Sequence, residues 1–136
     1  MRLMLAALSA TFCLLAFGQF ASADECKNDQ GHIMTDPAEF QAEIEKQTDC
    51  LPAKRLAEAC AWGSNLDVST AGLAYGICEK NLSDAKPKKS DLRLLAKMKD
   101  RCTARYINEE GSLYRSMNAF CHLNALTWIF DLVQEQ

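Results

Sequence analysis

Cysteine is the residue that most restricts this fold. Of seven cysteines, one lies in an apolar leader, and the other six are Cys26, Cys50, Cys60, Cys78, Cys102 and Cys121. An even number of cysteines in a short exported chain predicts three disulfides, each adding about 2–4 kcal/mol of stability. A metal site is the alternative. It is disfavoured because no C-x-x-C occurs and neither histidine lies at zinc-ligand spacing from paired cysteines.

The amino terminus predicts a signal peptide over residues 1–23. Arg2 supplies the positive charge, residues 3–20 are almost entirely apolar, and Ala21-Ser22-Ala23 offers the small residues of a cleavage site. An uncleaved anchor is disfavoured because the apolar core is short for a membrane span. The expected mature protein, residues 24–136, is a single domain that is periplasmic or secreted, without a stable membrane span after signal cleavage.

Charge narrows the class of partner. The chain has 15 Lys and Arg against 18 Asp and Glu, a formal net charge of −3, and loss of Arg2 with the leader makes it more acidic. An acidic balance disfavours nucleic acid, whose binding usually requires clustered basic residues. It favours a basic protein partner, because opposite charge steers association. The oligomeric state stays open.

Apolar periodicity predicts an all-α fold, a small disulfide-stapled bundle of four to five helices. Apolar residues recur at spacings of three and four, and no segment sustains the alternation of a strand. The expected helices begin at Asp36-Pro37, run from Pro52 to a stop at Gly63, from Val68 to Leu82, from an N-cap at Ser90 to Tyr106, and from an N-cap at Ser112 to Val133, with residues 83–90 as a linker.

The last of these helices is apolar nearly all round from Ala125 to Val133. Such a helix is typical of the centre of a bundle. In the alternative interpretation, part of its surface forms a patch or groove that receives a partner or an apolar ligand. The protein would then be a carrier of a small apolar ligand within the helical bundle.

Helix geometry favours one disulfide pairing. In an antiparallel hairpin, residues equidistant from the turn lie at the same height, since each residue rises about 1.5 Å. Cys102 and Cys121 are symmetric about Gly111-Ser112, and Cys50 and Cys78 are symmetric about Ser64-Asn65. Cys26 is then left to pair with Cys60. Six cysteines allow about 15 pairings in all, so this arrangement is a prediction.

Catalytic residues are not expected. His122 follows Cys121, but adjacent helical side chains point about 100° apart, so this imidazole cannot act as base for that thiol. His32 lies in a polar segment with no nucleophile nearby, and no Gly-rich phosphate loop occurs. No enzyme activity, cofactor or bound metal is therefore predicted.

The segment from Cys102 to Thr127 resembles the end of the lysozyme inhibitor LprI-like family. That family has a cysteine, a Gly-Ser turn, a methionine, a second cysteine and a threonine in this order. Here they correspond to Cys102, Gly111-Ser112, Met117, Cys121 and Thr127. Upstream, Cys50 and Cys60 flank a short helix as the family's cysteine pair does. Departures include Phe130, where the family usually has arginine.

The resemblance implies an exported helical domain that inhibits lysozyme by binding to it, and it implies no catalytic residues. An unidentified envelope partner is the alternative to lysozyme. The segment that carries the resemblance supplies four candidate partner-binding residues, which are Gly111, Ser112, Tyr114 and Met117.

Overall fold

The computed structural model describes residues 25–136, and the predicted signal peptide at residues 1–23 lies outside this range. Five α-helices form the described part, which confirms the expected all-α class. No helix in this range is long and apolar enough to span a membrane. The helices are α1 (Pro37–Glu45), α2 (Cys50–Ala59), α3 (Asn65–Asp84), α4 (Lys89–Tyr106) and α5 (Ser112–Gln134).

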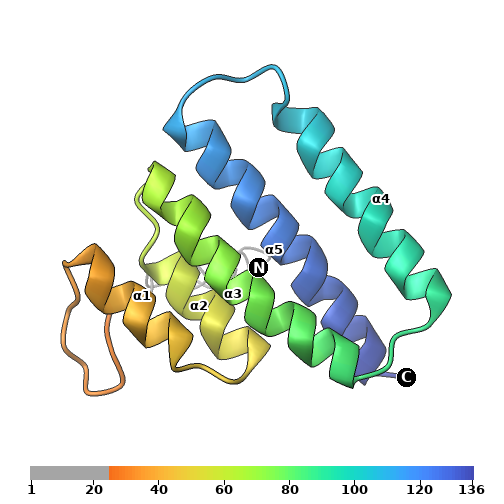
Figure 1. Ribbon diagram of the computed structural model, residues 1–136, viewed down its shortest axis with the longest axis horizontal. Coiled ribbons are helices and arrows are strands. Elements are labelled where there is room, and N and C mark those ends of the chain that lie inside the picture. Colours follow the sequence, from red (N-terminus) through yellow and green to blue (C-terminus); the bar gives the residue numbers. More distant parts are fainter. Residues whose placement is uncertain (1–24) are drawn as a thin grey trace, which may run out of the picture.

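The two long helices α3 and α5 pack side by side in the middle of the molecule (Figure 1). The short helices α1 and α2 pack against α3, and α2 also reaches α5. Helix α4 lies at the opposite end of the array, where its backbone packs against α5 and its Lys99 side chain reaches α3. The molecule is therefore a row of helices, and α4 is held mainly through α5.

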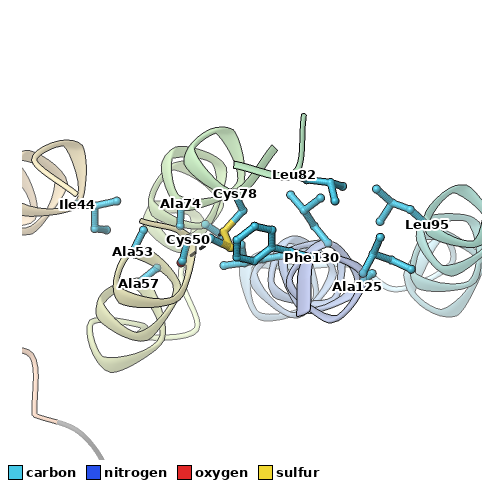
Figure 2. Close-up of a cluster of buried hydrophobic side chains, with 14 residues drawn as sticks. Ile44, Cys50, Ala53, Ala57, Ala74, Cys78, Leu82, Leu95, Ala125 and Phe130 are labelled. Carbon is cyan, nitrogen blue, oxygen red and sulfur yellow. Dashed lines mark hydrogen bonds between the residues drawn. A yellow bond between two sulfur atoms is a disulfide. The ribbon is translucent and has the colours of Figure 1, made fainter. Parts of the chain in front are cut away.

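The core gathers between α2, α3 and α5 (Figure 2). The ring of Phe130 from α5 lies beside the Cys50–Cys78 disulfide, and Leu95 of α4 faces Ala125 of α5. Leu123, Leu126 and Ile129 are completely buried, and burial of such a side chain contributes about 1.5–3 kcal/mol. Helix α5 is thus central, as the first interpretation of its apolar sequence predicts. Its Trp128 nevertheless stays 50% exposed.

Three disulfides link the helices in the pairing that the hairpin argument predicts. Cys50–Cys78 ties α2 to α3, and Cys102–Cys121 ties α4 to α5, with Cα–Cα distances of 4.3 and 5.7 Å. Cys26–Cys60 fastens the amino-terminal arm to the end of α2 at 4.7 Å. A chain held by three disulfides suits an oxidising compartment.

The first helix begins as predicted, whereas both ends of α2 differ from the prediction. Asp36 caps α1, its side chain accepting from the Ala38 N–H at 2.9 Å. Helix α2 begins at Cys50 rather than Pro52, because the Asn81 side chain accepts the Cys50 N–H at 2.8 Å. It ends at Ala59, before the predicted stop at Gly63, because the N–H groups of Trp62 and Gly63 donate to a side chain of α3.

The boundaries of the last three helices also correct the sequence prediction. Helix α3 runs to Asp84, inside the predicted linker 83–90, and the chain turns only at Lys86, whose φ is 55°. Ser90 lies inside α4 rather than capping it, because Asp91 accepts the Lys88 N–H at 2.9 Å. Gly111, with φ of 107°, takes the N-cap position predicted for Ser112, which becomes the first residue of α5.

Candidate functional site

One end of the molecule carries both apolar and acidic side chains that are exposed. This exposed surface comprises the α4–α5 turn, with Ile107, Glu109, Glu110 and Leu113, and the neighbouring Trp62 from the α2–α3 connection; we call it the turn surface. Ile107, Trp62 and Leu113 are 69, 58 and 53% exposed. Both glutamates are exposed, and neither is in an ion pair among residues 25–136. Large apolar side chains exposed together are typical of a docking site.

A buried carboxylate holds the α2–α3 part of this surface. Asp67, in the first turn of α3, is completely buried. Its two oxygens accept the N–H groups of Trp62, Gly63 and Ser64 at 3.0, 2.7 and 3.2 Å. The Ser116 hydroxyl of α5 donates to the same carboxylate at 2.6 Å. One side chain thus shapes the connection that carries Trp62 and joins it to α5.

The α4–α5 turn rests on this connection. The Ser112 hydroxyl lies 3.4 Å from the Gly63 carbonyl, to which it donates. Gly63 has φ of 71°, and a Cβ at this position would lie 3.1 Å from the Leu113 Cδ1 atom. The glycine therefore provides both the left-handed turn and the space against which Leu113 packs.

The structure separates the four candidate partner-binding residues. Gly111 and Ser112 are exposed at the beginning of α5, beside the turn surface, and Tyr114 is half-buried in the first turn of that helix. Met117 is 40% exposed and lines a different feature, the groove between α4 and α5. The predicted segment therefore reaches two surfaces rather than one.

The groove between α4 and α5 has a volume of about 720 Å³. Its apolar part includes the Cys102–Cys121 disulfide, and its charged part consists of arginines. The residues that line it are Met98, Arg101, Cys102, Arg105, Tyr106, Ser116, Met117, Phe120, Cys121, Asn124, Ala125 and Trp128. No aspartate or glutamate is among them, although acids outnumber bases in the chain as a whole.

A small polar cluster also links α4 to its neighbours. The Lys99 ammonium donates to the Tyr75 hydroxyl of α3 at 2.9 Å, and His122 Nε2 lies 3.2 Å from the Thr103 hydroxyl. Burial, together with the nearby Lys99 charge, lowers the pKa of His122 from its ordinary value of 6.5. Cys121 is bonded to Cys102, so this histidine has no thiol to activate.

The lowered pKa of His122 predicts acid-sensitive stability. The unfolded chain binds this proton more readily than the folded protein does. The contribution of neutral His122 to the free energy of unfolding is therefore complete above pH 6.5 and falls as the pH drops below that value. Titration of the His122 ring by NMR should give a pKa below 6.5, and the H122Q variant should lose less stability than the wild type between about pH 7 and about pH 5. A ring that titrates at or above its ordinary value would contradict the burial argument.

Within residues 25–136, no cluster of three or more His, Cys, Asp or Glu side chains could hold a metal ion. Comparison with known proteins adds no further constraint. No family model, no curated protein and no solved structure matches this chain.

Two sets of site residues could not be identified from the sequence. Trp62 lies near Leu113 in space because Asp67 holds the α2–α3 connection, whose Gly63 packs against Leu113. Arg101 and Arg105 lie one helical turn apart, and exposed basic residues at this spacing are typical of an ordinary solvated face. The only sequence signal for the groove is the apolar excess of α5, which includes Trp128.

Proposed function

We propose that this chain is an exported, non-enzymatic binding protein that docks a basic partner protein through its turn surface. Lysozyme is the partner that the family resemblance names. The observation that carries the proposal is the exposure of Trp62, Ile107 and Leu113 at the end of the molecule that also carries Glu109 and Glu110, neither of which is in an ion pair with a described residue.

The composition of the turn surface supports docking. Protein interfaces bury aromatic and aliphatic anchors at their centre and place polar groups around them. Trp62 is such an anchor. Its ring centroid lies 5.8 Å from that of the buried Phe40, so the indole is supported on one side and exposed on the other. Ordering a surface that the fold already holds costs less entropy than ordering a free loop.

Charge supports a basic partner. Glu109 and Glu110 place two negative charges on the turn of a chain whose formal net charge is −3. Opposite charge accelerates association at low ionic strength and fixes orientation. Lysozymes of the animal type are basic, so this electrostatic attraction favours them as partners. Three disulfides agree with a protein that works in an oxidising compartment, where such a partner is encountered.

Charge reversal at the turn tests the proposal. The E109K/E110K variant should bind an animal-type lysozyme with an association rate about tenfold lower at low ionic strength, because repulsion replaces steering. Surface plasmon resonance at several salt concentrations measures this rate. The matched control is E79K/E135K, which makes the same change in net charge at exposed positions away from the turn.

The control should retain most of the wild-type rate, and added salt should narrow the difference between the variants, since it screens exposed charges. Equal association rates for the two double variants would remove the turn from the proposed interface. The oxidised protein is produced with its own leader in an exporting host, so that its disulfides form as they do in the native chain.

A further inference from the structure

The groove between α4 and α5 is a second surface, with chemistry opposite to that of the turn surface. Helix α4 packs mainly against α5, and the seam between these two helices is open on one side. Met117, Phe120 and Trp128 line its α5 wall, and Met98 contributes from α4. Two of these side chains, Met117 and Trp128, are 40 and 50% exposed.

The charge of the groove points to an anion. Arg101 and Arg105 line it, no acid does, and neither arginine takes part in an ion pair among the described residues. The two guanidinium groups come from positions one helical turn apart, about 6 Å along α4. Such spacing allows both to approach one carboxylate, and arginine forms its strongest hydrogen bonds with ionised oxygens.

The arginines lie toward one end of the groove. Arg105 and Tyr106 belong to the last turn of α4, next to the α4–α5 connection. Met98 lies about two turns earlier, and Ala125 and Trp128 lie correspondingly later in the antiparallel α5. A ligand with a charged head and an apolar tail matches this order, whereas a uniformly apolar molecule leaves the arginines without a counterion.

We propose that the α4–α5 groove binds a single-chain anionic amphiphile of the fatty-acid class, with its carboxylate at Arg101 and Arg105 and its chain along Met98, Phe120 and Trp128. The volume of about 720 Å³ falls within the range of small-molecule sites. This goes beyond the proposed docking of a basic protein, because it concerns a different face and an anionic ligand.

Dodecanoate is the probe for this proposal. In a W62F variant of the oxidised protein, Trp128 is the remaining tryptophan, so its fluorescence reports on the groove. Saturable binding with a blue shift is expected for dodecanoate, and binding at least about tenfold weaker for dodecanol, which has the same chain without the charge. Equal affinity for the two, or no saturable binding of dodecanoate, would overturn the proposal.

A second experiment measures the binding of the same ligands to arginine variants by calorimetry. R101Q/R105Q should weaken dodecanoate binding at least about tenfold and leave dodecanol binding unchanged. The matched control is R93Q/K97Q, which removes two charges from exposed positions of α4 that do not line the groove, and it should bind as the wild type does. Unchanged binding by the first variant would contradict the assigned head-group site. Glu109 and Glu110 are untouched, so failure here is distinguishable from failure of the docking proposal.

Discussion

Replacing Asp67 with alanine should lower the free energy of unfolding by about 3–5 kcal/mol, a loss that few single substitutions produce. Its carboxylate is completely buried and accepts from three backbone N–H groups and the Ser116 hydroxyl. Alanine leaves all four donors without their acceptor inside the protein, and each such loss is costly. Urea denaturation followed by circular dichroism measures the change.

Two matched variants separate the role of the hydrogen bonds to the Asp67 carboxylate from the general effect of losing an acidic side chain. S116A removes one donor and should cost about 1 kcal/mol. D100A removes an exposed carboxylate from α4 and should stay within about 0.5 kcal/mol of the wild type. If D67A were as stable as D100A, the buried carboxylate would not be what holds the α2–α3 connection.

The second large effect is expected from the C102A/C121A variant. The disulfide closes a loop with a sequence separation of 19 residues, and its loss should lower the free energy of unfolding by about 3 kcal/mol. Because α4 packs mainly against α5, this helix should lose most of its protection. Hydrogen–deuterium exchange resolved by peptide should therefore show faster exchange over residues 89–106 than over α3.

The C50A/C78A variant is the natural comparison. The disulfide that this variant lacks lies in the core between α2 and α3. Its loss should lower the free energy of unfolding by about 3–4 kcal/mol but should not expose α4 selectively. Unchanged protection of α4 in C102A/C121A would mean that packing on α5 holds this helix without the covalent link. The groove, whose wall contains this disulfide, would then not depend on it.

Much of the fold follows from local rules applied to the sequence. Two disulfide pairs are predictable because α2 with α3, and α4 with α5, are antiparallel neighbours joined by short connections, so paired cysteines lie at equal heights. The third pair, Cys26–Cys60, then follows by elimination. Helix boundaries are less predictable because distant side chains decide them. Asn81 extends α2 back to Cys50, and Asp67 ends that helix before Trp62. Neither contact is visible in a local pattern.

The candidate sites, like the fold, are predictable from the sequence only in part. Gly111-Ser112 is recognisable from sequence as a turn, and it does begin α5 beside an exposed surface. The anchor Trp62 lies about 50 residues earlier and reaches that surface only through tertiary contacts around Asp67. The groove depends on α4 packing mainly against one helix, which is a property of topology rather than of any motif.

The most direct test of the proposed docking is a titration of the oxidised protein into a lysozyme cell-wall lysis assay, alongside the W62A variant. We expect saturable inhibition by the wild type, inhibition at least about tenfold weaker for W62A because an exposed aromatic anchor is lost, and loss of inhibition on reduction. Absence of inhibition across several lysozyme types, or equal inhibition by W62A, would contradict docking of lysozyme through the turn surface.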